Sequence, residues 1–462
     1  MSTHPSSFRD PAGLVLQGHG RIFRTIETCA RDDFARLNAS GLLRSLAREG
    51  KLVDSQAIGA EDMPQDLLAT LPAGDRLFLE HPRLPFVSYP YEWPFALLKR
   101  AALHHLDVQL ELLNSDFTLC DASAYNVQFR GTRPVFIDVL SIRPYKQGSY
   151  WAGYRQFCEQ FLNPLLLAAK VGVPFQAWYR GHAEGLPVNE MARLLPASSR
   201  LSPRLQLHVY LHARMSGSAR GAAGSAGGKP MTKSALVWLV GNMRACVAAL
   251  QSPVGRSTWG GYATQAPYTA QAAERKHTFV AAYVAALRPE LLLDLGCNSG
   301  DYSATALAAG ARRVIGTDLD LNALDEAVKA ADGQSLDFLP LFLDVLDPSP
   351  GQGWAGRERQ SFQDRLQAQG LLALALLHHM VIGRNVPLPQ AVDWLVSLAP
   401  TGVIEFVPKT DPMVQHMLSA REDIFADYTE AHFCQCLAQR ATLVRSERIS
   451  DTGRAVFQYE RT

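Results

Sequence analysis

A glycine-containing turn between two aspartates is the part of the sequence that most clearly suggests chemistry. The apolar stretch 291–293 runs into a turn that contains Gly296 and Gly300, and a helical pattern follows. Glycines let a backbone approach a ligand closely, and open α/β sheets bind ligands at turns of this kind, where strands end. The next strand pattern, VIGTD, ends in Asp318, 24 residues after Asp294. Because such an acid can accept hydrogen bonds from both hydroxyls of a ribose, the segment predicts a nucleotide-type cofactor site.

The residue order in this turn distinguishes two kinds of cofactor. The pattern is D-x-G-x-N-x-G, whereas a dinucleotide site uses G-x-G-x-x-G to free a helix N-terminus for a pyrophosphate. Asp294 stands directly before the turn, where a carboxylate suits a cationic ligand. S-adenosylmethionine (SAM) is a sulfonium with an amino-acid tail and no phosphate. The turn therefore favours SAM over a dinucleotide.

The segment ELLLDLGCNSGDYSATALAAGARRVIGTDLD resembles motifs I and II of class I SAM-dependent methyltransferases. The resemblance implies that Asp318 holds the ribose and that four residues line the methionine side of SAM, namely Asp294, Gly296, Asn298 and Gly300. A third strand, FLPLFLDV, carries Asp344, and an acid there commonly contacts the adenine amino group in this family. The implied fold class is α/β, with a Rossmann-like seven-stranded methyltransferase domain that ends in a hairpin around Asp451-Thr452-Gly453.

Candidates for a general base follow the fourth and fifth strands. The run LLALALLHH ends in His378 and His379, where this family places residues that face the methyl acceptor, and GVIEFVP carries Glu405. A neutral imidazole can accept a proton near pH 7, and adjacent strand residues point to opposite faces, so one histidine is expected to reach the acceptor. The alternative is that both histidines pack or cap. Glu405 is then the base, or it is the partner that orients a histidine.

Four further residues near the turn have a functional and a structural interpretation. Tyr268 and Lys276 are eight residues apart, about two helical turns, and share a face if a helix begins near Tyr268. In related methyltransferases the segment leading into the core closes over SAM; the alternative is a solvated helix. Asp320 is expected to cap a helix. Cys297 is expected to be a small packing residue, because no histidine lies nearby in the sequence to activate it.

The N-terminal part contains a second constellation. Asp121, Asn126 and Asp138 resemble the catalytic loop and metal-binding Asp of kinase-like folds, which implies that Asp121 would orient a hydroxyl while the other two hold magnesium. Gly18-His-Gly20 is only a fragment of a phosphate-binding loop, and no strand-borne Lys follows it. We therefore expect these residues, with Tyr125, to bind the acceptor without kinase activity. Turn capping and a bifunctional phosphotransferase-methyltransferase remain the alternatives.

Several stretches resemble the bacterial NoeA-like group of nodulation-protein-like methyltransferases. They include YPYEWPFALLKRAALHHL, LCDASAYNVQFRGTRPVFIDVLS and IEFVPKTDPMV, which together span both halves of the chain. This resemblance implies methyl transfer from SAM to a small-molecule or saccharide acceptor. A non-catalytic SAM-binding module is the other alternative.

The elements that position these residues are expected to form two domains, as the length of 462 residues suggests. We predict an N-terminal α+β domain over 1–214, a flexible linker over 215–233, a helical connector over 234–267 and the methyltransferase domain over 268–462. Helices are predicted over 94–113, 234–250 and 270–287, and two short strands around a loop are predicted over 117–141.

The composition excludes several classes of protein. Lys plus Arg (45) balance Asp plus Glu (44), so no overall field favours nucleic acid or an anionic membrane. The seven scattered cysteines form neither a disulfide framework nor a zinc spacing. The sequence starts without a secretory signal and contains no long apolar run. A cytoplasmic location without a membrane partner is therefore expected.

Overall fold

The computed structural model describes residues 2–216, 230–253, 269–419 and 421–462. The chain divides into two compact units, each described here by itself. Tyr268 and most of the predicted linker, 217–229, lie outside the described residues. No helix within the described ranges is long and apolar enough to cross a membrane. Unit 1 comprises Met1–Phe129, Arg133–Pro253 and Gly351–Arg359, and unit 2 comprises Arg130–Thr132, Val254–Pro350 and Gln360–Thr462.

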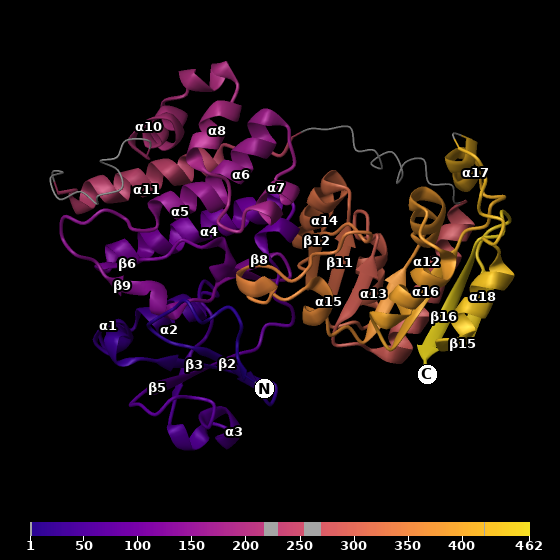
Figure 1. Cartoon of the computed structure of the whole chain (residues 1–462), viewed down its shortest axis with the longest axis horizontal. Coiled ribbons are helices and arrows are strands. Elements are labelled where there is room, and N and C mark those ends of the chain that lie inside the picture. Colours follow the sequence, from indigo (N-terminus) through magenta and orange to yellow (C-terminus); the bar gives the residue numbers. More distant parts are fainter. Residues whose placement is uncertain (1, 217–229, 254–268, 420) are drawn as a thin grey trace. The chain divides into compact units, whose positions relative to one another are not determined.

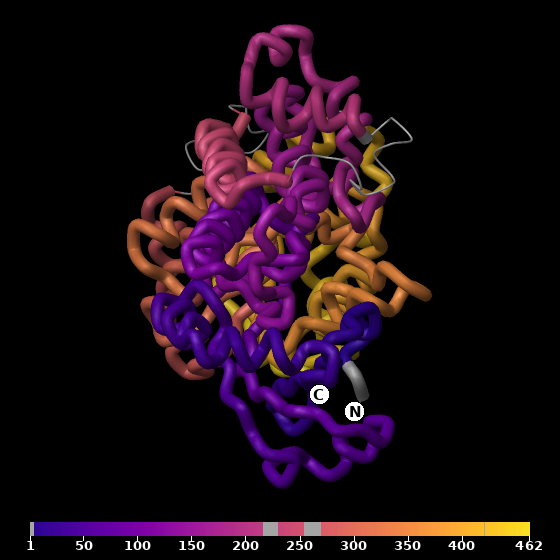
Figure 2. The backbone as a smooth tube through the Cα atoms, turned by 90° about the vertical axis from the view of Figure 1, so that its left-hand side faces the viewer, coloured from indigo at the N-terminus to yellow at the C-terminus, as the bar shows by residue number. Residues whose placement is uncertain are grey.

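Unit 1 contains a five-stranded antiparallel sheet in the order β1-β2-β3-β5-β4. This sheet lies at the opposite end of unit 1 from helices α8 and α10 (Figures 1 and 2). The segment 117–141, expected to form two strands, forms three short ones, because the chain also reverses at Gly131, whose φ of 57° favours glycine. The strands are β1 (Ser2–Thr3), β2 (Val15–Gly18), β3 (Arg21–Ile26), β4 (Gln56–Ile58), β5 (Leu77–His81), β6 (Phe117–Leu119), β7 (Val127–Arg130), β8 (Arg133–Phe136) and β9 (Ile142–Pro144).

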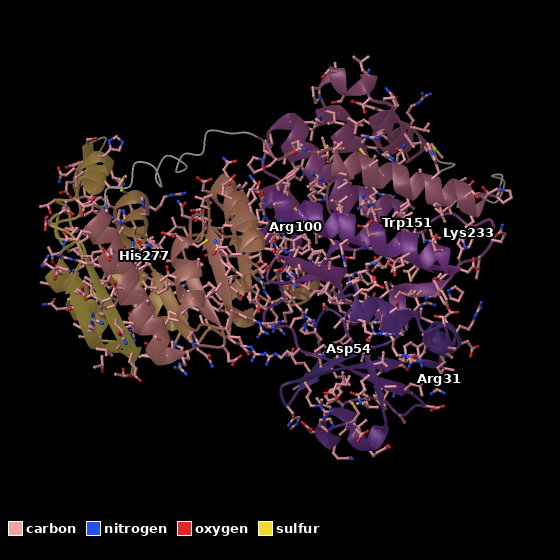
Figure 3. All side chains as sticks on the ribbon, turned by 180° about the vertical axis from the view of Figure 1, so that it is seen from behind. Arg31, Asp54, Arg100, Trp151, Lys233 and His277 are labelled. Carbon is pink, nitrogen blue, oxygen red and sulfur yellow. The ribbon has the colours of Figure 1, made fainter. Side chains whose placement is uncertain are left out.

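Helix α4 (Phe95–Asn114) forms the centre of unit 1 and matches the helix predicted over 94–113. Its buried His105 lies among aromatic rings, among them Trp151 at 6.0 Å between ring centroids, which Figure 3 labels. Helix α11 (Lys233–Ala248) packs against α4. The other helices of unit 1 are α1 (Arg31–Ala39), α2 (Leu42–Arg48), α3 (Gln65–Leu68), α5 (Tyr154–Phe157), α6 (Asn163–Leu166), α7 (Gln176–Gly181), α8 (Val188–Leu194), α9 (Pro203–Leu205) and α10 (His212–Ser216), with short 3₁₀ or π-helical segments between them.

Unit 2 is built on a seven-stranded sheet, as the sequence predicts, and its strand order is β12-β11-β10-β13-β14-β16-β15. The first five strands in that order are parallel and the last two are antiparallel, and every residue of β10 and β13 is buried. Strands buried on both faces are typical of parallel sheets covered by helices. The strands are β10 (Leu292–Leu295), β11 (Val314–Asp318), β12 (Phe338–Phe342), β13 (Gly370–Ala373), β14 (Thr401–Phe406), β15 (Ala441–Arg448) and β16 (Ala455–Arg461).

The strand order of unit 2 reverses direction at β10, because β11 lies on one side of it and β13 on the other. Open α/β sheets bind ligands in the crevice at such a switch point, outside the carboxyl ends of the strands. Three helices of unit 2 pack around Phe279, Leu292 and Phe338, namely α12 (Ala270–Leu287), α13 (Asp301–Ala308) and α14 (Leu321–Gly333). The other helical elements are α15 (Phe362–Arg365), α16 (Leu388–Ser397), α17 (Pro412–Ser419), α18 (Glu430–Ala438) and the π-helical turn η11 (His379–Gly383).

One local expectation in unit 2, the length of the fourth strand, is wrong. The strand expected to continue to His379 ends at Ala373, and the chain turns at Ala375, whose φ of 50° is incompatible with an extended strand. The two histidines therefore lie at the start of η11 instead of on alternate faces of a strand. The helix predicted over 270–287 is confirmed, because α12 begins at Ala270, where the side chain of Thr269 caps it by accepting from the Ala272 N–H.

Candidate functional site

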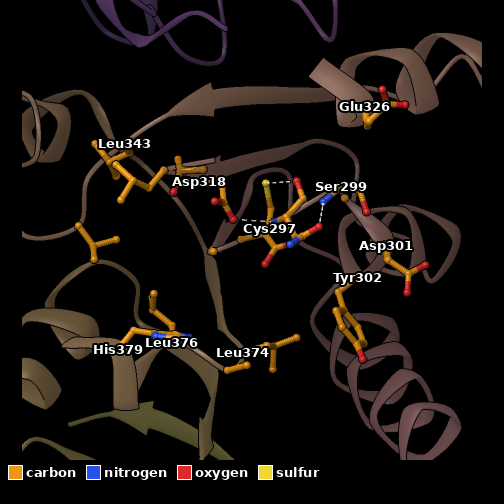
Figure 4. A pocket seen from close by; sticks show the side chains of 18 of the residues that line it. Cys297, Ser299, Asp301, Tyr302, Asp318, Glu326, Leu343, Leu374, Leu376 and His379 are labelled. Atoms are coloured by element: carbon orange, nitrogen blue, oxygen red, sulfur yellow. Dashed lines mark hydrogen bonds between the residues drawn. The ribbon is translucent and has the colours of Figure 1, made fainter. Parts of the chain in front are cut away.

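The glycine turn after β10 has a backbone that side chains would disturb. Gly296 and Gly300 have φ angles of 74° and 88°, a region that favours glycine. A Cβ at Gly300 would come within 2.4 Å of the Phe338 ring. Asn298 also has a positive φ, of 50°, and its N–H donates to Asp318 Oδ2 at 2.8 Å, shown as a dashed line in Figure 4. The turn and the end of β11 therefore hold each other in place.

Asp318 lies at the end of β11 and keeps both carboxylate oxygens oriented. The Asp320 N–H donates to Asp318 Oδ1 at 2.8 Å, and burial raises the pKa of Asp318. An ionised carboxylate has about four lone-pair positions, so each oxygen can accept a further hydrogen bond from a ligand. Asp320 itself caps α14 by accepting from the N–H groups of Asn322 and Ala323, as expected.

Asp294 lies beneath the turn and is almost completely buried. Ser303 on α13 donates its hydroxyl to Asp294 Oδ2 at 2.6 Å. Burial raises the pKa of Asp294 to about 6, because removal from water disfavours the charged form. A cationic ligand group near this carboxylate would favour ionisation and would itself be stabilised. Cys297 is buried, and burial raises the pKa of its thiol well above the ordinary value, as suits the packing role expected for it.

These residues line a cavity of about 1120 Å³ at the carboxyl ends of the strands, around the switch point between β10 and β13. The predicted residues on it are Lys276, Asp294, Gly296, Asn298, Gly300, Asp318, Asp344 and His379. Figure 4 shows Leu374, Leu376 and His379 on one side of the cavity and Asp318 and Leu343 on another.

A buried chain of charges supports the cavity from the β14 side. Lys276 Nζ on α12 lies 2.6 Å from Glu405 Oε2, and Lys276 also lies 4.5 Å from the centroid of the Tyr302 ring. Arg454 Nη1 lies 3.6 Å from Glu405 Oε1, and Arg454 Nε donates to Asp411 Oδ2 at 2.6 Å. All four charged side chains are at most 2% exposed. Buried charges need partners of this kind, so this series of ion pairs holds Lys276 at the cavity wall.

The three candidate bases occupy different positions. His379 lines the cavity, whereas His378 and Glu405 do not. His378 is fully buried, and its ring lies 4.1 Å from the ring of His379. Glu405 accepts from Lys276 and from the N–H of Ala375, at 2.9 Å, which holds the turn after β13 in place. Burial, and to a lesser extent the nearby Arg454, lowers the pKa of His379 to about 4, so this imidazole is neutral near pH 7.

No protein-family model matches the chain. The chain is 43% identical over 461 residues to the nodulation protein NoeA of Rhizobium meliloti (strain 1021), and the match covers 99% of the chain and 95% of that protein. The chain belongs to the NoeA family. Its similarity to solved structures is partial. The N-methyltransferase NodS of Bradyrhizobium japonicum WM9 is 13% identical, with 41% of the NoeA-family chain and 96% of NodS covered at a TM-score of 0.31. Magnesium protoporphyrin IX methyltransferase of Synechocystis PCC 6803 with bound SAM is 21% identical. The match covers 41% of the NoeA-family chain and 80% of that methyltransferase at a TM-score of 0.29.

The second constellation of this NoeA-family chain lies in unit 1. The side chain of Asn126 donates to Asp121 Oδ2 at 2.9 Å and to Asp138 Oδ2 at 3.3 Å. Arg24 Nη1 lies 2.8 Å from Asp138 Oδ1, so a guanidinium takes an oxygen that a magnesium ion would need. Among the described residues no group of three or more His, Cys, Asp and Glu side chains is arranged to hold a metal. Tyr125 lies beside this group, with the Arg359 guanidinium 3.8 Å from its ring centroid.

Some residues of the cavity carried no signal in the sequence. Met380, Gly383 and Arg384 line it from η11 and the loop that follows, and Met417 lines it from α17. These residue types are common on protein surfaces and in cores, and no motif surrounds them. The usable signal for Met380, Gly383 and Arg384 was their position shortly after His379, in a chain whose parallel strands all end on one side of the sheet, and Met417 had no such signal.

Proposed function

We propose that unit 2 of this NoeA-family chain binds SAM and transfers its methyl group to a small-molecule or saccharide acceptor. The observation that carries the proposal is the joint lining of one cavity by Asp294, the glycine turn and Asp318 at the switch point of the sheet. The carboxylates suit a cationic ligand that carries a ribose, and the open backbone of the turn admits it closely. The cavity volume of about 1120 Å³ is sufficient for a cofactor together with a small acceptor.

The proposed roles follow the positions of the residues. Asp318 would hold the ribose hydroxyls, and Asp344, which lines the same cavity, would contact the adenine amino group. Gly296, Asn298 and Gly300 bring backbone against the methionine part, with the carboxylate of Asp294 nearby to attract its cationic groups. Lys276 is held by Glu405 at the same wall, where its ammonium can attract the carboxylate of the amino-acid tail.

Methyl transfer from a sulfonium is an in-line displacement, for which an enzyme mainly aligns the acceptor and excludes water. When bound, SAM would supply the methyl group. The apolar side chains of Leu374 and Leu376 wall the cavity where β13 ends. His379 is the candidate base that lies on the cavity, and its neutral ring can accept a proton from an acceptor hydroxyl. Glu405 would act on the reaction by holding Lys276 and the turn at Ala375.

We further propose that Asp121, Tyr125, Asn126 and Asp138 of unit 1 contribute to recognition of the acceptor. The support is that burial raises the pKa of Asp121 and that Asn126 orients two carboxylates toward one another. The test is methyl transfer by Asp121→Ala, which should be lost while SAM binding is kept. ATP turnover abolished by Asp138→Asn would show phosphotransferase activity and contradict this role.

Calorimetric titration of the full chain with SAM tests the main proposal. Asp318→Asn removes the charge while keeping the shape, and Asp337→Asn is the matched control, because Asp337 pairs with Arg313 and does not line the cavity. Saturable binding that only Asp318→Asn weakens would support the proposal. Absence of SAM binding to the wild-type chain would refute it. Binding without transfer of labelled methyl to any component of a small-molecule extract would favour a non-catalytic SAM-binding module.

A further inference from the structure

The charges that line the cavity are unevenly distributed. Its five carboxylates all come from the segment between β10 and the loop after β12, namely Asp294, Asp301, Asp318, Glu326 and Asp344. The lining residues between Leu374 and Met417 include no acidic side chain, and they bring His379 and Arg384 to the cavity. The first side suits the cationic groups of SAM. The second side does not repel an anion.

Arg384 differs from the two lysines on the same cavity. Lys276 Nζ lies 2.6 Å from Glu405, and Lys329 Nζ lies 2.6 Å from Glu326. Arg384 is exposed, and its guanidinium forms neither a hydrogen bond nor an ion pair with any residue in the described ranges. Among the described Lys and Arg side chains that line the cavity, Arg384 is therefore the one whose charge is available to pair with a ligand.

The loop that carries Arg384 is held in place. The guanidinium of Arg421 donates to the Ile382 carbonyl and to the side chain of Asn385, one residue on each side of the Gly383–Arg384 pair. Met417 on α17 contacts the same stretch, since a Cβ at Gly383 would lie 3.2 Å from its methyl group. A guanidinium on an anchored loop loses less conformational freedom on binding, and its planar fork matches the two oxygens of a carboxylate or phosphate.

We propose that the methyl acceptor is an anion, and that Arg384 binds its carboxylate or phosphate group at the end of the cavity that His379 and Met417 line. This inference rests on the proposed function and specifies its substrate class. A bound anion on this side would also oppose the effect of Arg454 on His379 by stabilising a protonated imidazole.

The test uses the full chain saturated with S-adenosylhomocysteine, whose binding is measured first by calorimetry. Failure of that first step would refute the proposed function itself, separately from the acceptor class. The probes are then D-glucuronate, glucose 6-phosphate and uncharged glucose, and their binding is followed by ligand-observed NMR. We expect at least one anionic probe to bind with an affinity about five times that of glucose or higher. The reason is that a bidentate pair with a guanidinium is stronger than an ordinary surface ion pair.

Arg384→Gln should remove this preference for anions, and Arg384→Lys should retain part of it. The control is Arg275→Gln, since Arg275 is an exposed arginine of α12 that does not line the cavity, and this variant should behave as wild type. Comparing the affinities of D-glucuronate and glucose 6-phosphate would show whether the site prefers a carboxylate or a phosphate. Equal binding of charged and neutral probes, binding of none, or an anion preference that survives Arg384→Gln would each overturn the proposal.

Discussion

Replacing Glu405 by Gln should destabilise unit 2 far more than the loss of an ordinary surface charge. Glu405 is fully buried, and its Oε2 lies 2.6 Å from Lys276 Nζ. The amide of Gln fills the same volume and can still accept from the Ala375 N–H, so the change removes mainly the charge. Lys276 then loses the carboxylate that lies 2.6 Å from its Nζ, whereas Arg454 keeps its two hydrogen bonds to Asp411, at 2.6 and 2.8 Å.

The expected cost follows from this geometry. Breaking a buried ion pair costs about 3 to 5 kcal/mol when one charge is left behind. The lower end applies here, because Lys276 keeps its contact with the Tyr302 ring, 4.5 Å from its Nζ. A loss of about 3 kcal/mol lowers the melting temperature of a domain of this size by roughly 6 to 12 °C. Glu447→Gln is the matched control, because Glu447 on β15 pairs with Arg445 at 2.7 Å with 35% of its side chain exposed. That pair should contribute less than about 1 kcal/mol.

The assay is thermal unfolding of the full chain, with hydrogen exchange of peptides from β13 and β14 to assign the transition to unit 2. Glu405→Gln should melt earlier and exchange faster in those peptides, and Glu447→Gln should resemble wild type. Adding Lys276→Met to Glu405→Gln should recover part of the loss, because it removes the buried positive charge that faced Glu405. If Glu405→Gln melts at the same temperature as Glu447→Gln, the buried pair does not stabilise the fold and this reasoning is refuted.

Three further predictions concern the cavity. Asp318→Asn should weaken SAM binding about tenfold or more in calorimetry, since hydrogen bonds to a charged group contribute about 1.5 to 3 kcal/mol; unchanged affinity would remove Asp318 from the site. Because burial raises the pKa of Asp294 to about 6, its carboxyl loses its proton as pH rises through that value, so affinity for cationic SAM should increase between about pH 5 and pH 7. Asp294→Asn should flatten that profile, and an equally steep profile in the variant would assign the titration to another group. His379→Ala should lower the rate of methyl transfer by about 10² to 10⁴ with SAM affinity kept, whereas His378→Phe should keep most of the rate; the reverse order would make His378 the base.

The fold class and the framework of unit 2 could be predicted from the sequence because they depend on local patterns. The buried strands β10 and β11 are short apolar runs, and the turn between β10 and α13 contains glycines where the backbone needs positive φ angles. The predicted α/β class and seven-stranded sheet are confirmed by the strand order. The cap at Asp320 was also predictable, since it involves only N–H groups two and three residues away.

The ends of elements were harder to predict where a distant residue decides them. The run LLALALLHH is apolar enough for a longer strand, yet β13 ends at Ala373. The turn at Ala375 is held by Glu405, 30 residues away in the sequence. A pattern of apolar residues contains no information about that hydrogen bond, so the predicted strand was too long and its alternation of side chains did not apply.

Sequence alone determined which residue types could bind a cationic, ribose-containing cofactor, because Asp294, the glycine turn and Asp318 lie within one strand-turn-helix-strand unit. Only the tertiary structure decided which side chains reach the cavity. It brings His379 to the wall and buries His378, pairs Glu405 with Lys276 on α12, and sets Arg24 against Asp138. Each of these outcomes depends on charges and packing between segments far apart in the chain, where the cost of burying a charge selects the partner.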